Sequence, residues 1–255
     1  MPFNSVLVTG ANRGIGLEFV RQFIKFENGP QHVFACCRDP SKASELTKVK
    51  GEAKEVQVHV LVMDVTDDEQ IERAAIYVES VVGEDGLNLL INNAGILHRD
   101  GTKLPTVDRA LLVRHFDVNA ASPILVTQAF LPLLRKAAGQ HPNEPMSLFH
   151  SGVVAISSGI GSISGNTSGS EMVGYGYRLS KAALNMAVKC LSVDAKKDRI
   201  LFVSVCPGWV RTDMGGQRAM LTPEQSISTM LTAFKQFTDE HSGGYFQRDG
   251  TPMAF

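Results

Sequence analysis

Hydrophobic and polar positions along the chain follow two different periods. Short runs of β-branched and apolar residues are typical of buried strands, and longer amphipathic segments with a period near 3.6 are typical of helices. We expect strands over residues 5–9, 32–37, 56–63, 87–91, 152–157 and 200–205. We expect helices over residues 16–26, 67–83 and 121–139.

The order of these elements predicts the fold class. Strands that alternate with helices form right-handed βαβ units and therefore a parallel sheet. The strand runs are almost continuously apolar, as expected when helices cover both faces of the sheet. We predict an α/β protein, a single doubly wound Rossmann domain over residues 1–255 with a parallel sheet of about seven strands.

Two irregular stretches interrupt this pattern. Residues 139–147, "GQHPNEPMS", are expected to form a surface loop before a strand. Residues 159–174, "GIGSISGNTSGSEMVG", form a longer stretch rich in Gly and Ser. Because the second stretch begins directly after a strand, it lies where doubly wound folds place their ligands.

Composition excludes several classes of partner. The 255 residues include 25 Lys and Arg against 26 Asp and Glu, so there is no basic excess that would favour nucleic acid. No apolar run approaches the 18 or so residues that a membrane span needs, and the first residues do not resemble a signal peptide. We expect a cytoplasmic protein without membrane or nucleic-acid partners.

The four cysteines are interpreted as reduced packing residues. They are Cys36, Cys37, Cys190 and Cys206, and none has the spacing of a C-x-x-C motif. A zinc site built on them is improbable, and we expect no metal site.

The stretch "VTGANRGIG" follows the first strand and opens the first helix. Gly10, Gly14 and Gly16 would allow a tight turn and let the backbone approach a diphosphate at the helix N-terminus. A simple turn between strand and helix is the alternative. The position of this stretch at the start of an alternating chain favours the nucleotide loop.

The end of the second strand indicates which dinucleotide is bound. Proteins that bind NAD carry an acidic residue about 20 positions after the glycine loop, and here that count leads to two cysteines followed by Arg38. Arg13 lies inside the loop itself. Two guanidinium groups suit a 2′-phosphate, so we predict NADP(H), although Arg38 alone could be a solvated strand end. Asp39 precedes a proline, which is typical of a helix N-cap, and it is assigned to capping.

The stretch "YGYRLSK", residues 175–181, holds a pair that shares one helix face. Tyr177 and Lys181 are four positions apart, whereas Tyr175 and Lys181 are six apart. Taken alone, such a pair also occurs by chance on solvated helices.

Seven motifs along the chain together indicate a function for Tyr177 and Lys181. In order they are "TGANRGIG" (9–16), "MDVTD" (63–67), "NNAG" (92–95), "VNAASP" (118–123), "ISS" (156–158), "YRLSK" (177–181) and "PGWVRTDM" (207–214). With these motifs the chain resembles the classical short-chain dehydrogenase/reductases over nearly its whole length. The spellings "GANRGIGL", "CRDP" and "DGTPMAF" look closest to the sniffer-type and C-factor-like carbonyl reductases.

This resemblance implies a set of catalytic residues. Tyr177 matches the proton donor, and Ser158 matches the serine that binds the substrate oxygen. Lys181 matches the partner of the tyrosine. Asn119 should lie at a helix irregularity and support a water-linked proton path to Lys181. The non-catalytic alternatives are that Ser158 caps a turn, that Asn119 is an amide on a helix surface and that Lys181 is solvated.

The resemblance also implies the cofactor contacts. Asp64 should lie by the adenine, Pro207 and Gly208 by the nicotinamide, and Thr212 by its carboxamide or the phosphates. The full set is Gly10, Asn12, Arg13, Gly14, Ile15, Gly16, Arg38, Asp64, Val65, Asn92, Ala94, Gly95, Asn119, Tyr177, Lys181, Pro207, Gly208, Val210 and Thr212.

These roles are consistent with the chemistry of carbonyl reduction. The nicotinamide supplies a hydride to carbon, and a side chain must supply a proton to oxygen. An ammonium about 4 Å from a phenol contributes roughly 4 kcal/mol at an effective dielectric of 20, which is at most about three pKa units. We therefore expect Lys181 and the oxidised nicotinamide to bring the pKa of Tyr177 near neutrality.

One departure from the family pattern concerns the substrate pocket. Tyr177 follows Ser158 by 19 positions, more than the shortest common spacing, which leaves Ser162 and Ser164 as weaker rivals to Ser158. We expect the pocket to be formed by residues 96–103, 159–174 and 207–226. Trp209, Met214 and Met220 suit an apolar, tolerant pocket, though they could equally be packing residues.

The predicted function is NADPH-dependent reduction of aldehydes, ketones or quinones, with a small-molecule carbonyl as the substrate. The alternatives are a dehydrogenase for a steroid, retinoid or pterin alcohol, and a non-catalytic NADP-binding signalling protein. The resemblance suggests a homodimer or homotetramer joined through helices at 106–138 and 177–197.

Overall fold

A parallel sheet runs through the centre of the molecule. Within residues 3–26 and 29–255, which the computed structural model describes, seven parallel strands form one sheet in the order β3-β2-β1-β4-β5-β6-β7. The strands are β1 (Ser5–Thr9), β2 (His32–Cys37), β3 (Gln57–Val62), β4 (Leu89–Asn92), β5 (Gly152–Ile156), β6 (Leu201–Cys206) and β7 (Gly244–Gln247).

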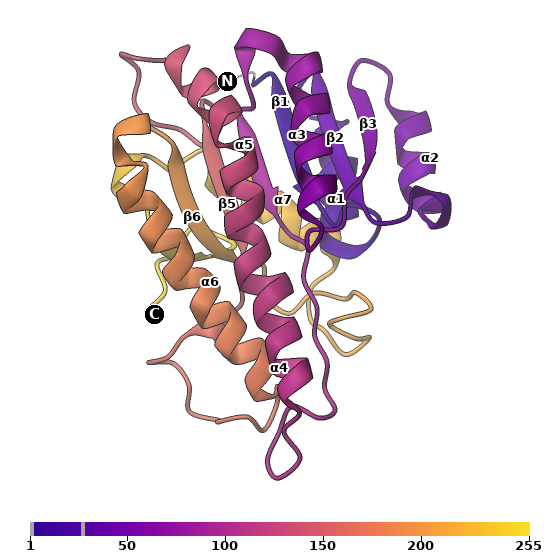
Figure 1. Cartoon of the computed structure of the whole chain (residues 1–255), viewed down its shortest axis with the longest axis vertical. Helices are drawn as coiled ribbons and strands as arrows, with labels where there is room; N and C mark the ends of the chain where they lie inside the picture. Colours follow the sequence, from indigo (N-terminus) through magenta and orange to yellow (C-terminus); the bar gives the residue numbers. More distant parts are fainter. Residues whose placement is uncertain (1–2, 27–28) are drawn as a thin grey trace.

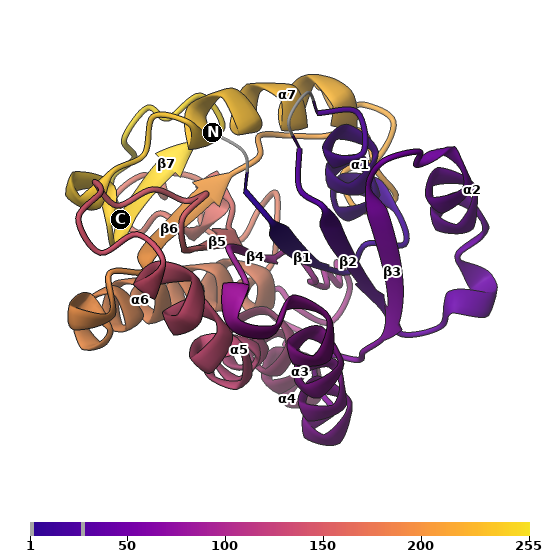
Figure 2. The ribbon, with the colours of Figure 1, turned by 90° about the horizontal axis from the view of Figure 1, so that it is seen from above.

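Helices cover both faces of this sheet. They are α1 (Gly14–Phe23), α2 (Ser44–Glu52), α3 (Asp68–Val82), α4 (Arg109–Phe116), α5 (Ser122–Gly139), α6 (Tyr175–Asp194) and α7 (Pro223–Phe234). Seen from above, α1, α2 and α7 lie on one face, and α3, α4, α5 and α6 lie on the other (Figure 2). The predicted doubly wound α/β architecture is confirmed.

The alternation of side chains along β1 builds two separate cores. All five residues of β1 are buried. Val6 and Val8 belong to the core beneath α1 and α7, whereas Leu7 belongs to the core beneath α3 and α5. Successive residues of a strand point to opposite faces, so an almost continuously apolar run is what a strand covered on both sides requires.

Most elements expected from the sequence are present, with shifted ends. All six expected strands form, and the one expected at 87–91 runs over Leu89–Asn92. The expected helices at 67–83 and 121–139 are α3 and α5 almost to the residue. Three elements were not expected: α2, α7 and β7. A short polar helix and a four-residue strand give weak periodic signals, but α7 carries a Thr222–Gln225 capping box that marks its start.

The strand order places a crevice next to β1. Chain order reverses between β1 and β4, which is the switch point where doubly wound sheets bind ligands beyond their carboxyl ends. The connection from α5 to β5 lies at the opposite end of the molecule, near the N-terminus (Figure 1). Among the described residues, no helix combines the length and apolar character that crossing a bilayer requires.

Candidate active site

The glycine loop between β1 and α1 is closely packed against its surroundings. A Cβ atom on Gly16 would lie 2.3 Å from the carbonyl oxygen of Gly10, so only glycine fits there. Gly14 has a φ of +55°, a left-handed conformation that favours glycine. The backbone N–H of Ala11 donates to the carbonyl of Cys36, 2.9 Å away, which ties the loop to the end of β2. The loop thus brings free backbone N–H groups to the N-terminus of α1, where an anion would bind.

Two side chains fasten the end of β4 to this loop. Thr9 Oγ1 accepts hydrogen bonds from the backbone N–H groups of Asn93 and Ala94, each at 2.9 Å. Asn93 Nδ2 donates to the carbonyl oxygens of Thr9 at 2.8 Å and Gly10 at 3.3 Å. We call these contacts the Thr9–Asn93 clasp. It fixes the carboxyl ends of β1 and β4 side by side at the switch point.

Asn93 was not among the residues expected from the sequence, whereas its neighbour Asn92 was. The side chain of Asn92 is buried and donates from Nδ2 to Thr127 Oγ1 at 3.1 Å and to the carbonyl of Pro123 at 3.4 Å, both on α5. It therefore points away from the glycine loop, and only its backbone can face a cofactor. The alternation of side chains along a strand was the signal that could have separated the two asparagines.

Asn119 lies in a π-helical turn, Asp117–Ala121, that joins α4 to α5. The helix irregularity expected at this residue is confirmed, and a surface amide is excluded because the side chain is fully buried. Asn119 Oδ1 accepts from the N–H of Ile96 at 2.8 Å, and Nδ2 donates to the carbonyl of Ile96 at 3.0 Å and to Ser180 Oγ at 3.0 Å. These contacts tie the segment after β4 to helix α6.

Ser158 and Tyr177 meet at the carboxyl end of β5. Ser158 caps the short helical turn Gly159–Gly161 by accepting from the N–H of Ile160 at 3.3 Å. Its hydroxyl also lies near the phenol of Tyr177, the third residue of α6, and lowers the pKa of that phenol. Capping and contact with the tyrosine are thus compatible.

Lys181 reaches the same place from one turn further along α6. Its side chain is buried, and Nζ donates to the carbonyl oxygen of Ile156 at 2.7 Å. Nζ lies 5.7 Å from the centroid of the Tyr177 ring. A solvated lysine is thereby excluded, and the four residues expected to be catalytic lie around one end of β5 and α6.

Burial changes the pKa values of both members of this pair. Burial raises the pKa of Tyr177 to about 12, although the Ser158 hydroxyl opposes the change. Burial also lowers the pKa of Lys181 to about 8. The chain by itself does not shift the pKa of the tyrosine toward neutrality, because desolvation disfavours both the phenolate and the ammonium. The expected shift with the oxidised nicotinamide bound stays a prediction.

The loop at 159–174 is held by the C-terminal residues and by α6. Ser162 Oγ and Ser164 Oγ donate to the carbonyls of Ala254 and Phe255, each at 2.7 Å, so neither rival serine is directed at Tyr177. Buried Arg178, next to Tyr177, donates to Val173, Asn166 and Ser168 of the loop. This role was not predicted from the sequence, because the contacts of Arg178 depend on how the irregular 159–174 loop folds back on α6.

The other two expected pocket segments contact each other and this loop. Arg99 Nη2 donates to the carbonyl of Met214 at 3.3 Å, and Lys103 Nζ donates to the carbonyl of Glu171. Trp209, Met214 and Met220 are 47%, 39% and 76% exposed, which indicates a rim rather than core packing.

The segment after β6 closes over the glycine loop. A Cβ on Gly14 would lie 3.2 Å from Thr212 Cγ2, and Arg13 Nη1 pairs with Asp213 at 2.9 Å across the two segments. Gly208 has a φ of +80°, and Val210 is buried. The segment that carries Thr212 and Asp213 therefore lies against the glycine loop, and contact of Pro207, Gly208 and Val210 with the cofactor stays a prediction.

The adenine end of the expected site lies beyond β2 and β3. Arg38 is exposed at the end of β2. Asp39 accepts from the N–H of Ser41 at 3.1 Å, which confirms its assignment to capping, and the hydrogen bond from the Ser41 side chain lowers the pKa of its carboxyl group. Asp64 Oδ1 accepts from the N–H and hydroxyl of Thr66 at the end of β3, next to buried Val65. Asn12 and Ile15 belong to the glycine loop and are partly buried.

The cysteines are free, as expected, but they do not all pack. Cys36 and Cys37 are buried in β2, whereas Cys190 is exposed on α6, so its interpretation as a packing residue is wrong. Cys206 is partly buried, and its Sγ accepts from the N–H of Gly159 at 3.0 Å.

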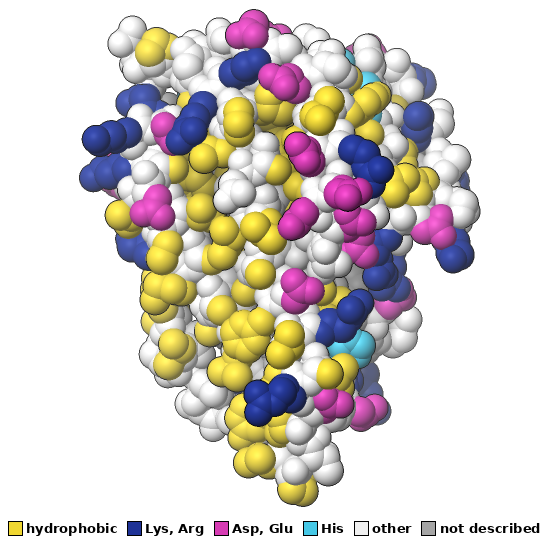
Figure 3. All heavy atoms as spheres, viewed as in Figure 1, with side chains coloured by type: hydrophobic (Ala, Val, Ile, Leu, Met, Phe, Trp, Pro, Cys, Tyr) yellow, Lys and Arg dark blue, Asp and Glu magenta, His cyan; other side chains and the backbone are white. Residues whose placement is uncertain are grey.

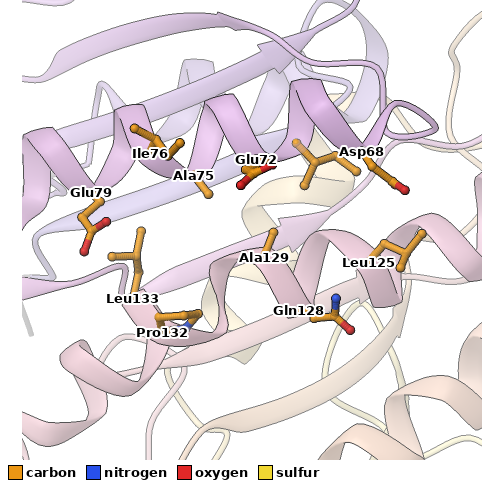
Figure 4. A pocket seen from close by; sticks show the side chains of 11 residues that line it. Asp68, Glu72, Ala75, Ile76, Glu79, Leu125, Gln128, Ala129, Pro132 and Leu133 are labelled. Carbon is orange, nitrogen blue, oxygen red and sulfur yellow. The ribbon is translucent and has the colours of Figure 1, made fainter.

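A groove of about 440 Å³ lies outside this site, between α3 and α5. Apolar side chains and the carboxylates of Asp68, Glu72 and Glu79 line it, and none of the expected catalytic residues does (Figure 4). The convergence of polar groups, rather than the depth of a cavity, therefore identifies the candidate active site.

Comparison with known proteins decides the family. The model of the short chain dehydrogenase family matches residues 4–220. The chain belongs to the short-chain dehydrogenase family. This short-chain dehydrogenase is 40% identical to the C-signal of Myxococcus xanthus over 169 residues, which are 66% of this chain and 93% of that protein.

Two solved structures are similar to this short-chain dehydrogenase over nearly its whole length. The carbonyl reductase Sniffer of D. melanogaster is 38% identical, with a TM-score of 0.94 over 99% of this chain and 100% of that chain. The NADPH-bound carbonyl reductase from chicken fatty liver is 37% identical, with a TM-score of 0.94 over 100% of this chain and 95% of that chain. The resemblance to sniffer-type carbonyl reductases is confirmed.

The two asparagines provide a test of the clasp. Asn93→Ala removes the bonds to Thr9 and Gly10, so we expect NADPH to bind at least about tenfold more weakly. Asn92→Ala breaks a contact with α5 of similar size and should lower stability, yet leave NADPH affinity within about threefold. Calorimetric titration with NADPH and urea unfolding of both variants measure the two effects. Equal losses of affinity would contradict a special role for Asn93.

Proposed function

We propose that this short-chain dehydrogenase reduces carbonyl compounds to alcohols with NADPH. The observation that carries the proposal is the convergence of Ser158, Tyr177 and Lys181 beside the crevice at the glycine loop. The similarity to a carbonyl reductase whose structure contains NADPH supports the same conclusion.

The residues of the crevice fit NADP(H). The lack of space for any side chain at Gly16 and the N–H groups at the start of α1 suit a diphosphate. Arg38, exposed at the end of β2, would supply positive charge for a 2′-phosphate, and Asp39 is engaged in its own cap. Arg13 pairs with Asp213 in this structure, so it would have to exchange that partner for the phosphate. Gly95, a predicted cofactor contact, lies beside Asn119 and Lys181. When bound, NADPH supplies the hydride.

The chain's own residues handle the proton. With a pKa raised to about 12, Tyr177 is protonated at pH 7 and can donate its hydroxyl proton to the alkoxide oxygen, which is a far stronger base. Ser158 Oγ is placed to hydrogen-bond the same oxygen and stabilise its developing charge. The ammonium of Lys181 stabilises the phenolate that remains, because opposite charges attract strongly in a buried site.

The surroundings of Tyr177 favour apolar carbonyl substrates. The exposed rim of Trp209, Met214 and Met220 offers an aromatic ring and flexible thioethers, which adapt to ligands of different shape. We propose aldehydes, ketones and quinones as the substrate class. A dehydrogenase for a steroid, retinoid or pterin alcohol would use the same groups in the reverse direction. A non-catalytic signalling protein would not need Tyr177 and Lys181 in contact distance.

We further propose that the chain acts as one domain and assembles into a homodimer or homotetramer. The sheet draws its strands from both ends of the chain. Hydrophobic side chains gather on the face formed by α4, α5 and α6 (Figure 3), and those exposed there include Val113, Phe116, Ile124, Leu125, Leu179, Met186 and Val193. A second copy would cover them. Four free thiols suit the reducing cytoplasm that we propose as its location.

Replacing the proposed proton donor should abolish most of the activity. We expect Tyr177→Phe to lower kcat/KM for carbonyl reduction by at least about 100-fold, since general acids contribute roughly 10²–10⁴-fold. NADPH affinity should stay within about threefold. Tyr175→Phe, two residues earlier on the same helix, is the control and should keep full activity. Consumption of NADPH with a panel of aldehydes and quinones measures the rates, and an active Tyr177→Phe enzyme would refute the mechanism.

Arg38 should determine cofactor preference. Because its guanidinium would pair with the 2′-phosphate, we expect Arg38→Ala to weaken NADPH binding at least about tenfold and NADH binding less than twofold. Arg73→Ala, an exposed arginine on α3, is the control. Titration of each of the two variants with NADPH and with NADH gives four dissociation constants, which are compared with those of the wild type. If Arg38→Ala loses affinity for both cofactors equally, Arg38 does not bind the 2′-phosphate.

Lys181 should give the reaction its alkaline limit. As the pH rises through about 8, the lysine loses its proton and no longer stabilises the phenolate. At saturating NADPH, we expect kcat/KM for reduction to be level at pH 6–7 and to fall above pH 8 or so. Lys181→Arg, whose side chain stays charged, should lose this fall even where its rate is reduced, and Lys189→Arg should retain it. A wild-type rate that is constant up to pH 10 would contradict this role.

A further inference from the structure

The loop between α5 and β5 gathers three side chains of the kind that bind transition metals. His141, Glu144 and His150 each offer one ligand atom, and these atoms lie within 4.8 Å of one another. His141 Nδ1 is 2.7 Å from Glu144 Oε1, and His150 Nε2 is 3.4 Å from Glu144 Oε2. This loop was expected only to be a surface connection, and the catalytic site makes no use of it.

His150 is held in place by its other ring nitrogen. The side chain is 9% exposed, and Nδ1 lies 3.2 Å from the carbonyl oxygen of Pro145. A proton on Nδ1 satisfies that carbonyl and directs the lone pair of Nε2 at the carboxylate of Glu144. Metal-binding histidines are oriented in this way, with the second nitrogen donating to a carbonyl.

A neutral His150 cannot satisfy both of its neighbours. With the proton on Nδ1, Nε2 and the carboxylate of Glu144 face each other as two acceptors; with the proton on Nε2, Nδ1 faces the Pro145 carbonyl unprotonated. The His141 ring stacks on the His150 ring with 3.9 Å between the centroids, so two charged rings would repel each other. A cation between Nε2 and the carboxylate removes the conflict without charging either ring.

We propose that His141, Glu144 and His150 form a zinc site at the end of the molecule opposite the active site. Two imidazole nitrogens and one carboxylate oxygen are a known ligand set for Zn²⁺, with water in the fourth position. Zn–N bonds of roughly 2.0–2.1 Å place tetrahedral ligand atoms about 3.3 Å apart, and the 3.4 Å between His150 Nε2 and Glu144 Oε2 is close to this separation. Binding requires the proton of His141 to move from Nδ1 to Nε2, which faces away from Glu144.

The position of the site predicts its effect. His141 lies just after the last turn of α5, and His150 lies just before β5, so the metal would join the ends of two core elements. Because Ser158 follows the other end of β5, the zinc would not reach the groups that react. We therefore expect bound zinc to stabilise the fold and to leave the catalytic rate unchanged.

Zinc binding can be measured directly on the full chain. Chelator-treated protein with Cys190→Ser, which removes an exposed thiol that could compete, is titrated with ZnCl₂ by calorimetry and followed by thermal unfolding. We expect one Zn²⁺ per chain and a higher unfolding temperature with Zn²⁺ but not with Mg²⁺. Co²⁺ should give the visible absorption bands of a tetrahedral site.

Two variants test the histidine ligands, and a third variant is the control. We expect His141→Gln and His150→Gln each to weaken zinc binding at least about tenfold. His141 is partly exposed, so its variant should fold even if that of His150 does not. His59→Gln is the matched control, because His59 also contacts a second histidine, His32, with ring nitrogens 3.2 Å apart. No uptake of Zn²⁺ at micromolar concentration, uptake that survives His141→Gln, or equal loss in His59→Gln would overturn the proposal.

Discussion

The hydrogen bonds of Thr9 and Asn93 are the constraint on which the rest of the site depends. One hydroxyl and one amide hold the carboxyl ends of β1 and β4 together at the point where the strand order reverses. The glycine loop leaves β1 directly after Thr9, and a Cβ atom on Gly16 would lie 2.3 Å from the carbonyl oxygen of Gly10 and 2.6 Å from Asn93 Nδ2. The segment after β4 then passes Asn119, which connects it to α6 and so to the reacting groups. A short chain of hydrogen bonds thus links the glycine loop to α6, which carries Tyr177 and Lys181.

Burial gives the catalytic pair its electrostatic character. Desolvation raises the pKa of Tyr177 and lowers that of Lys181, so each group is driven toward its neutral form. In the proposed reduction, a phenol that holds its proton at pH 7 can act as the proton donor. The cost falls on the phenolate left after transfer, and the lysine ammonium, fixed by the carbonyl of Ile156, offsets it. The positive ring of the oxidised cofactor would add to the same stabilisation.

Sequence patterns predicted the sheet, both helical layers and the residues around Tyr177, because periodicity and ordered motifs report burial and position along the chain. Sequence patterns did not predict contacts that depend on the direction in which a side chain points. Asn92 and Asn93 are adjacent letters of one motif, yet only Asn93 faces the glycine loop. Two other features were not predicted: the hydrogen bonds of Arg178 to the 159–174 loop and the cluster of His141, Glu144 and His150. Both depend on contacts of irregular segments, whose sequences show no hydrophobic periodicity. The pKa of Tyr177 could not be predicted either, because desolvation depends on packing that the spacing of Tyr177 and Lys181 does not encode.

The central claim is that NADPH transfers a hydride to the carbon of a carbonyl group while Tyr177 donates a proton to its oxygen. The most direct measurement is a single turnover with NADPH deuterated at the transferring position of the nicotinamide, with an aldehyde or ketone as acceptor. The account predicts one alcohol formed for each NADPH oxidised, with deuterium on the new carbinol carbon and a slower transfer step than with unlabelled NADPH. Binding of NADPH without reduction of any acceptor in an aldehyde and ketone panel, or alcohol that carries no deuterium, would contradict it.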